Sequence, residues 1–301
     1  MTGSAAPGHL AVIGLGFIGR RIARTARAGG WDVTALSRRH VALPGVRVIE
    51  GDAADPLAVA QATEGTTWVV FAAGTTKPAE SDQDPLTHAV HNLAPVLSAL
   101  EATAAAGARG FTFLSSGGTV YGPSAPVPTP EDTPLWPISS YGVMKAAAEQ
   151  YVAMHAHHDG FAADILRCAN VFGPGEPTSG SQGLIGIARA RLRAGEPVVM
   201  FGDGSARRDY LHVDDLAEVV LALAGRPDGI RVLNVGSGTT TSVAEIISGL
   251  ASALGVEPVI DRRPARESDS PVAELDISRL RELLDFRPRS ADDWLATVDP
   301  E

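Results

Sequence analysis

The feature that most constrains the fold is an alternation of short, continuous apolar segments with stretches of helical periodicity. The apolar segments are typical of buried strands, and they occupy residues 9–13, 31–36, 46–49, 67–71, 110–114, 163–167 and 231–235. Helical patterns separate several of them, at residues 20–28, 56–63, 85–107 and 143–158. Strands that are apolar along their whole length belong to parallel sheets with helices on both faces. The sequence therefore predicts an α/β fold built on a doubly wound parallel sheet.

A glycine triplet, Gly14-x-Gly16-x-x-Gly19, lies between the first predicted strand and the first predicted helix, with Phe17 and Ile18 inside it. Glycines at this spacing let the backbone approach a pyrophosphate, and the helix N-terminus stabilises its negative charge. The motif in this context predicts a dinucleotide site. A glycine-rich packing turn is the alternative.

The end of the second predicted strand bears on which dinucleotide is bound. An NAD site usually offers a carboxylate there, whereas an NADP site offers arginine for the 2′-phosphate. This chain has Ser37-Arg38-Arg39, and a guanidinium can bind a phosphate through two parallel hydrogen bonds. We therefore expect NADP to be favoured and NAD to remain possible. The alternative is a solvated basic turn.

Tyr141 and Lys145 lie one helical turn apart, on one face of a predicted helix. A cationic Lys145 at this spacing is expected to lower the pKa of Tyr141, so that its phenol can act as a general acid or base near neutral pH. Lysine is rare in this chain: 23 of the 25 basic residues are arginine, and the other lysine is Lys77. The pairing with Tyr141 therefore gives a chemical reason for a lysine at residue 145, whereas the sequence gives no such reason for Lys77.

Composition excludes several kinds of partner. A net charge of −10 without a basic run predicts no nucleic-acid binding. The first apolar stretch is too short to cross a bilayer, so no membrane segment is expected. Cys168 is the only cysteine, which rules out an internal disulfide and fits a reducing, cytoplasmic location. The histidines of residues 155–158 lie near a helix end, where imidazoles are favourable, and no metal site is expected.

These motifs resemble the extended short-chain dehydrogenase/reductases, and within them the nucleotide-sugar epimerase/dehydratase group. The resemblance covers nearly the whole chain. It is carried by residues 14–19, Phe71-Ala-Ala-Gly74, Asn92, residues 113–122, Ser139-Ser-Tyr-Gly-Val-Met-Lys145, residues 167–174, residues 201–204 and 208–215, Asn234-Val-Gly-Ser-Gly238 and Leu275-Asp-Ile-Ser278. It implies a Rossmann dinucleotide-binding domain at residues 1–172 and 208–236. A smaller, discontinuous α/β nucleotide-sugar-binding domain would take residues 173–207 and 237–301.

The resemblance also implies residue roles. Tyr141 would be the acid/base, and Lys145 would bind the nicotinamide ribose. Asp52 would contact the adenine of the cofactor, with Ala53 beside it. Ala72, Ala73 and Gly74 would line the cofactor site, and Asn92 would belong to a polar network behind the catalytic pair. Asn170, Arg208 and Arg266 would hold the diphosphate of a nucleotide-diphosphate sugar. A homodimer is a further family expectation.

Two departures from the family pattern matter. The family's first glycine falls on Ile13, with Gly14 one place later. The family's catalytic Ser or Thr falls on Gly117. One possibility is that Ser116 or Thr119 replaces that hydroxyl, and Ser116 would then also contact the substrate. The other is that Tyr141 and Lys145 work without it.

The leading interpretation is an NAD(P)-dependent nucleotide-sugar epimerase that acts at sugar C4 through a transient keto intermediate. The alternative is an NADPH-dependent reductase of a keto-sugar nucleotide, which the two arginines after the second strand favour. A dehydratase is less favoured, because it usually needs an extra acid and base beside the first catalytic hydroxyl, and Gly117 and Gly118 occupy the positions of the hydroxyl and the acid. A non-catalytic NADP-sensing protein is also less favoured, because it needs no Tyr–Lys pair.

Overall fold

The computed structural model describes residues 8–74, 84–180, 183–265, 270–290 and 294. These residues form two compact units. The first unit comprises residues 1–120, 137–167 and 217–233, and the second comprises residues 121–136, 168–216 and 234–301. Each unit is interrupted in sequence, so the chain passes between them several times. Among the described residues, no helix has both the length and the apolar character needed to span a bilayer.

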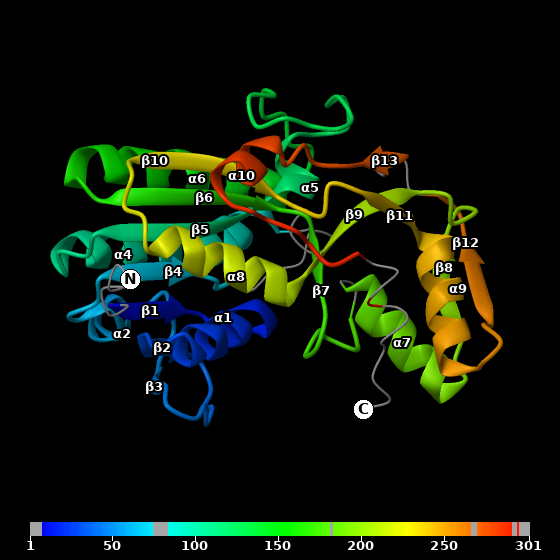
Figure 1. The fold of residues 1–301 in the computed structure, drawn as a ribbon, viewed down its shortest axis with the longest axis horizontal. Coiled ribbons are helices and arrows are strands. Elements are labelled where there is room, and N and C mark those ends of the chain that lie inside the picture. The colour runs from blue at the N-terminus through cyan, green and yellow to red at the C-terminus, as the bar shows by residue number, and fades with distance from the viewer. Residues whose placement is uncertain (1–7, 75–83, 181–182, 266–269, 291–293, 295–301) are drawn as a thin grey trace. The chain divides into compact units, whose positions relative to one another are not determined.

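A seven-stranded parallel sheet, with the strand order β10-β6-β5-β4-β1-β2-β3, is the centre of the first unit (Figure 1). Its strands are β1 (His9–Ile13), β2 (Asp32–Ser37), β3 (Arg47–Glu50), β4 (Trp68–Phe71), β5 (Gly110–Ser116), β6 (Ala162–Cys168) and β10 (Ile230–Val235). The strand order reverses between β1 and β4, which are parallel and in register from Leu10↔Trp68 to Ile13↔Phe71. A reversal of this kind leaves a crevice at the carboxyl ends of the two strands. The predicted doubly wound sheet is confirmed.

Helices cover both faces of this sheet. They are α1 (Phe17–Ala28), α2 (Pro56–Thr63), α4 (Pro85–Ala105), the short α5 (Gly117–Val120), α6 (Ser140–Asp159) and α8 (Val213–Ala224). Figure 1 shows α1 and α8 in front of the sheet and α4 and α6 behind it. The rear face is covered by an extended apolar core, in which Val59, Leu100 and Val152 cluster with Phe111 and Phe113 of β5. Burial of such side chains contributes roughly 1.5–3 kcal/mol each to folding.

Two helices of the first unit begin earlier than the sequence predicts. The helix expected at residues 20–28 begins at Phe17, because Gly16 occupies the N-cap and Gly19, despite its low helix propensity, lies inside the first turn. The helix expected at 143–158 begins at Ser140, since the Ser139 hydroxyl caps it by accepting from the Gly142 N–H at 3.1 Å. Tyr141 therefore lies in the first turn of α6.

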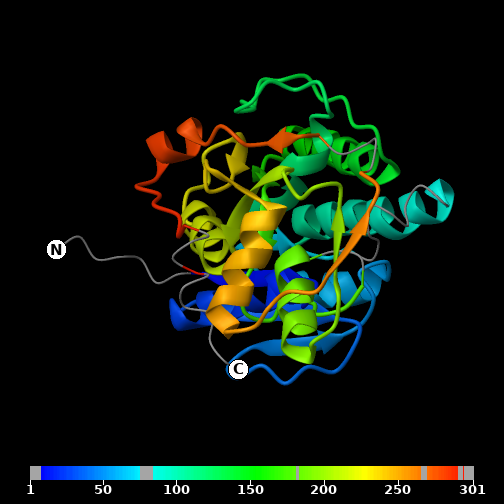
Figure 2. The ribbon, with the colours of Figure 1, turned by 90° about the vertical axis from the view of Figure 1, so that its right-hand side faces the viewer.

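The second unit has smaller sheets. The strands β7 (Asn170–Phe172), β9 (Arg207–His212), β11 (Thr240–Ser242) and β13 (Val272–Ala273) form one sheet, and β8 (Val198–Phe201) pairs with β12 (Ile260–Arg263). Its helices are α7 (Leu184–Ala194), α9 (Val243–Leu254) and α10 (Ser278–Leu283). Figure 2 shows α7 in light green beside α9 in orange, and Ile185 and Leu192 of α7 share an apolar core with Leu250 of α9. The predicted smaller α/β domain is confirmed as a fold.

The loop before α6 belongs to the second unit, although the sequence analysis assigns residues 121–136 to the first domain. Three buried polar links within the second unit bind this loop. Tyr121 Oη donates to Asn234 Oδ1 at 2.6 Å, the Asn234 N–H donates to Glu131 Oε1 at 2.9 Å, and Asn234 Nδ2 donates to the Thr129 carbonyl at 2.8 Å. No local periodicity in the sequence indicates these long-range bonds.

Candidate active site

The glycine loop crosses the carboxyl end of β1 next to the segment that follows β4. Gly14 has φ of +100°, and a Cβ there would lie 2.6 Å from Ala73 Cα. A Cβ at Gly19 would lie 1.9 Å from the Gly14 carbonyl oxygen, so α1 packs directly on the loop. A side chain at either position would force the two segments apart.

Gly16 differs from the other two glycines of the triplet. It is the N-cap of α1, no side chain caps the helix there, and a Cβ at Gly16 would meet no atom within 4 Å. No side chain at Gly16 therefore covers the backbone N–H groups at the N-terminus of α1. Backbone N–H groups at an uncovered helix N-terminus can bind a pyrophosphate. The residues present fit a dinucleotide.

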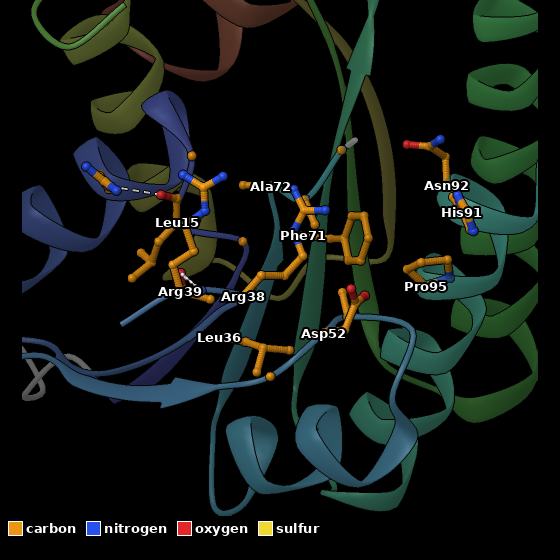
Figure 3. A pocket seen from close by; sticks show the side chains of 18 residues that line it. Leu15, Leu36, Arg38, Arg39, Asp52, Phe71, Ala72, His91, Asn92 and Pro95 are labelled. Carbon is orange, nitrogen blue, oxygen red and sulfur yellow. Dashed lines mark hydrogen bonds between the residues drawn. The ribbon is translucent and has the colours of Figure 1, made fainter. Parts of the chain in front are cut away.

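A cavity lies at this crevice, wholly inside the first unit (Figure 3). It is lined by most of the residues expected at the cofactor: Gly14, Gly16, Ser37, Arg38, Arg39, Asp52, Ala53, Ala72, Ala73, Gly74 and Asn92. Leu15, Arg20, Leu36, Gly51, Phe71, His91 and Pro95 complete the lining. In Figure 3, Arg38 and Asp52 lie close to Phe71, and Asn92 lies across from them on α4. Segments from four strand ends and α4 thus converge on one cavity.

Three arginines line the cavity, although the sequence analysis identifies only two of them. Arg38 and Arg39 follow β2 and are exposed, and Arg20 in the first turn of α1 donates from Nε to the Leu15 carbonyl at 2.9 Å. Asp52 is the one carboxylate in the lining, and its Oδ1 accepts from the Ala54 N–H at 2.9 Å. The cavity wall is therefore cationic in a chain of net charge −10. Arg20 could have been found from its position directly after Gly19.

Phe17, Ile18 and Gly19 do not line this cavity. Gly19 is buried against Gly14, and Phe17 and Ile18 are half-buried in the first turn of α1. Their cofactor contacts remain a prediction.

Tyr141 and Lys145 share one face of α6, beside the end of β5. Lys145 is buried, and its Nζ donates to the Leu114 carbonyl at 2.7 Å. The same ammonium lies 4.7 Å from the centre of the Phe113 ring and 5.7 Å from that of Tyr141, within the range of cation–π attraction. The positive charge is thereby fixed next to the phenol ring.

The polar residues behind Tyr141 come from α4. Asn92 Nδ2 donates to the His88 carbonyl at 3.0 Å, and the His88 ring lies 6.2 Å from the Tyr141 ring. Ser140 Oγ is 3.5 Å from His88 Nδ1. Asn92 therefore occupies a polar layer next to the tyrosine, and His88 is a member of that layer that the sequence analysis does not name.

Ser116 and Thr119 flank the position that lacks a hydroxyl. Ser116 ends β5, Gly117 begins α5, and Thr119 Oγ1 donates to the Ser116 carbonyl at a long 3.4 Å. A Cβ at Gly118 would meet nothing within 4 Å. The backbone thus leaves open space at Gly118, whereas Gly117, the position that matches the family's hydroxyl, is buried.

Two of the residues expected at the diphosphate lie in the second unit. Asn170 begins β7, and its Nδ2 donates to the Asp209 carbonyl at 3.1 Å. Arg208 lies in β9, and its Nη1 donates to the carbonyls of Arg207 and Ser270 at 2.9 and 2.7 Å. Arg266 and Lys77 lie outside the described residues.

Glu176 is a buried carboxyl that the sequence analysis does not single out. It lies between β7 and α7, is 7% exposed, and accepts hydrogen bonds from the backbone N–H groups of Gly186 and Gly173. Burial raises its pKa to about 7, against the effects of these hydrogen bonds and of Arg189. Burial also raises the pKa of Tyr210 to about 12. Neither shift can be read from sequence, because it depends on packing.

Within the described part of the chain, no group of three or more His, Cys, Asp or Glu side chains is placed to hold a metal ion. The histidine cluster instead contains a local pair, in which His155 Nδ1 lies 2.9 Å from Asp159 Oδ2.

Comparison with known proteins agrees with this geometry. A UDP-glucose 4-epimerase of Mycolicibacterium smegmatis is 36% identical over 211 residues, which are 70% of this chain and 67% of that protein. The structure of a UDP-glucose 4-epimerase with UDP-glucose from Thermotoga maritima has a TM-score of 0.88 and 29% identity, over 95% of this chain and 96% of that one. A UDP-glucose 4-epimerase of Thermus thermophilus in complex with NAD has a TM-score of 0.87 and 29% identity, over the same shares.

Residues 10–236 match the sequence pattern of one family, and this match spans the glycine loop, the Tyr–Lys pair and all seven strands of the large sheet. The shared segment therefore contains both the crevice and the helix that carries the acid/base candidate. The chain belongs to the NAD dependent epimerase/dehydratase family, and it is an NAD(P)-dependent enzyme.

Proposed function

We propose that this enzyme is a nucleotide-sugar epimerase that inverts C4 of the sugar of a nucleotide-diphosphate sugar. The observation that carries the proposal is the position of Tyr141 and Lys145 on α6, bound to the end of β5 in the same unit as the glycine-lined cavity. The two solved relatives named above, both called UDP-glucose 4-epimerase, support the reaction class.

The cofactor would occupy the cavity of the first unit. Its pyrophosphate would lie at the open N-terminus of α1 beside Gly14 and Gly16, and its adenine would lie near Asp52 and Ala53. Ala72, Ala73 and Gly74 would line its path toward Lys145. When bound, the nicotinamide supplies a hydride acceptor that also returns the hydride, so the reaction has no net redox change.

Tyr141 would take the proton of the sugar hydroxyl while that carbon is oxidised, and would return it when the carbonyl is reduced on its other face. The Lys145 ammonium, fixed by the Leu114 carbonyl, would stabilise the phenolate and bind the nicotinamide ribose. Ser116 or Thr119 would supply the hydrogen bond that Gly117 cannot. Asn170, Arg208 and Arg266 would hold the diphosphate, for which guanidinium groups are suited.

The three arginines of the cavity favour NADP over NAD. An NADP ribose carries a 2′-phosphate, and Arg38 and Arg39 lie at the end of β2, where that phosphate is received in this fold. Arg20 adds a third guanidinium to the same cavity. This wall also favours the second candidate function, an NADPH-dependent reductase of a keto-sugar nucleotide, because such an enzyme consumes a reduced coenzyme.

A single experiment separates the two functions. The purified protein is incubated with a panel of nucleotide sugars and 4-keto-sugar nucleotides, with and without added NADPH, and products are followed by mass spectrometry and NMR. An epimerase gives an isomer of unchanged mass without added coenzyme. A product that gains two hydrogens only with NADPH refutes the epimerase and identifies the reductase.

We further propose a homodimer through α4 and α6. These helices pack against each other on the rear face of the sheet, and they expose apolar side chains that a single copy leaves in water. Leu86 and Val90 on α4 are 76% and 53% exposed, and Val143 and Met154 on α6 are 54% and 42% exposed. Sedimentation velocity with Leu86→Glu tests the proposal, and a wild type that remains a monomer at micromolar concentration refutes it.

A further inference from the structure

A buried hydrogen-bond network lies behind the Tyr141–Lys145 pair. Ser115 Oγ donates to Glu149 Oε1 at 2.5 Å. Arg167 donates from Nε to both Glu149 oxygens at 3.2 and 3.1 Å, and from Nη2 to Oε2 at 2.8 Å. The Glu149 and Arg167 side chains are 2% and 7% exposed. These three residues form the Ser115–Glu149–Arg167 network.

The network lies on the helix face that carries the acid/base candidate. Tyr141, Lys145 and Glu149 follow one another at four-residue spacing along α6, and residues at this spacing share a helix face. Lys145 donates to the carbonyl of Leu114, and Glu149 accepts from the hydroxyl of the next residue, Ser115. Two successive turns of α6 are thus bound to two successive residues of β5.

The same attachment reaches the neighbouring strand. Arg167 lies in β6, so its bonds to Glu149 fix α6 against β6 as well as β5. Bonds to two strands fix both the rotation of the helix and its position along its axis. The residues after the attachment points on β5 are Ser116 and Gly117, where the catalytic hydroxyl is expected.

A buried ion pair is not by itself an argument for stability. Exchange of such a pair for apolar side chains of similar volume is often neutral or stabilising. The rate of a reaction is more sensitive to the position of its groups, because displacement of a reacting group by about 1 Å can reduce the rate about 10²-fold. A network joined to the catalytic helix at this point is therefore better suited to hold Tyr141 in place than to raise stability.

We propose that Glu149 is a positioning residue, which with Ser115 and Arg167 holds the phenol of Tyr141 at its working distance from the reacting sugar. The inference rests on the proposed function, since it takes Tyr141 as the acid/base. It predicts that loss of the network lowers kcat, whereas KM and cofactor affinity change little.

Three variants test the proposal. Glu149→Met with Arg167→Met removes the ion pair without leaving a buried charge. Ser115→Ala keeps the ion pair and removes only the bond to β5. The control is Asp164→Leu with Arg231→Met, which removes an ion pair between buried Asp164 of β6 and half-buried Arg231 of β10, in which Arg231 Nε donates to Asp164 Oδ1 at 2.6 Å. Asp164 and Arg167 are three apart in β6, so their side chains point to opposite faces of the sheet.

The expected result is a separation of kcat from KM. The Glu149→Met/Arg167→Met variant should keep its melting temperature and lose kcat by about 10–100-fold, with KM and the cofactor Kd within threefold of wild type. Ser115→Ala should lose about 3–10-fold in kcat, and the control pair should stay within twofold. A kcat within twofold of wild type in the folded double variant overturns the proposal. If that variant does not fold, an unchanged kcat in Ser115→Ala overturns it.

The rates are measured on whichever reaction the wild type performs in the substrate panel. A wild type that reduces keto sugars refutes the epimerase but leaves the network test intact. If the wild type turns over nothing, hydrogen exchange decides. Amides of residues 140–148 should exchange at least fivefold faster in Ser115→Ala than in wild type, with no change in the control pair. Equal exchange overturns the proposal.

Discussion

The buried carboxyl of Glu176 gives a prediction whose sign and size follow from the structure. Glu176 lies against the first turn of α7, where a Cβ at Gly183 would be 2.8 Å from its Oε1. Its surroundings favour the neutral acid, which raises the pKa from the ordinary 4.5 to about 7. Between pH 4.5 and 7 the folded chain therefore binds this proton more tightly than the unfolded chain does.

The sign of the pH dependence follows from that difference. The stabilisation is fully present below the unfolded pKa of 4.5, falls as pH rises, and is lost above the folded pKa of about 7. Each pKa unit corresponds to 1.36 kcal/mol, so the full effect is about 3 kcal/mol. About 2–3 kcal/mol of it falls between pH 5 and pH 8.

Glu176→Gln removes this titration and keeps an oxygen that can accept a backbone N–H. We expect the free energy of unfolding of the variant minus that of wild type to increase by about 2–3 kcal/mol from pH 5 to pH 8, because wild type loses this stabilisation and the variant does not. Urea unfolding of both proteins at the two pH values measures this quantity, and titrations common to both proteins cancel. The difference between variant and wild type is compared at two pH values, so any pH-independent effect of the amide on stability cancels as well.

The matched control is Glu257→Gln, an exposed carboxylate in the same unit. Its relative free energy of unfolding should be the same at both pH values within about 0.5 kcal/mol. The reasoning on Glu176 is refuted if Glu176→Gln also shows no pH-dependent difference, or if the variant is the less stable protein by a larger margin at pH 8 than at pH 5.

Three further predictions concern the cavity and the helix beside it. Tyr141→Phe should lower kcat by about 10²–10⁴-fold with the cofactor Kd within threefold, and retained turnover in the NMR assay would refute the acid/base role. Arg38→Ser with Arg39→Ser should weaken NADP binding by about 10–100-fold and NAD binding by less than threefold in calorimetric titrations, and equal losses would contradict a 2′-phosphate site. Gly117→Ser should raise kcat by about tenfold at constant KM, whereas an unchanged kcat would mean that the site needs no hydroxyl there.

The large sheet could be predicted from sequence because its inner strands are buried on both faces and so have continuous apolar runs, whereas the edge strand β3 is only half-buried at its centre. The segment Trp68–Phe71 is an example, with all four residues buried. The strands of the second unit lack this signal. In β9, for instance, Arg207 and Arg208 are only half-buried and precede four buried residues, and β13 has two residues. Such strands are specified by their partners rather than by their own periodicity.

The same distinction applies to the site. Gly14, Arg38 and Tyr141 could be identified because their chemistry is tied to a fixed spacing from a strand or to a partner on the same helix. Ser115 and Glu149 could not, since their roles depend on a contact between residues 34 apart in sequence. Glu149 repeats the four-residue spacing of Tyr141 and Lys145, but a carboxylate at that position is typical of any solvated helix face until its burial is known.

The contacts around Gly117 discriminate between the two hydroxyls that could replace the missing one. Thr119 Oγ1 already donates to the Ser116 carbonyl, and it would have to exchange that bond for one to the sugar. Ser116 Oγ forms no hydrogen bond with the described part of the chain, and its backbone directly follows Ser115, which is fixed by Glu149. A hydroxyl that is both available and held by a rigid strand end loses little on binding a substrate. Ser116 is therefore the better candidate, and the expected gain from Gly117→Ser is modest because a hydroxyl already lies one residue away.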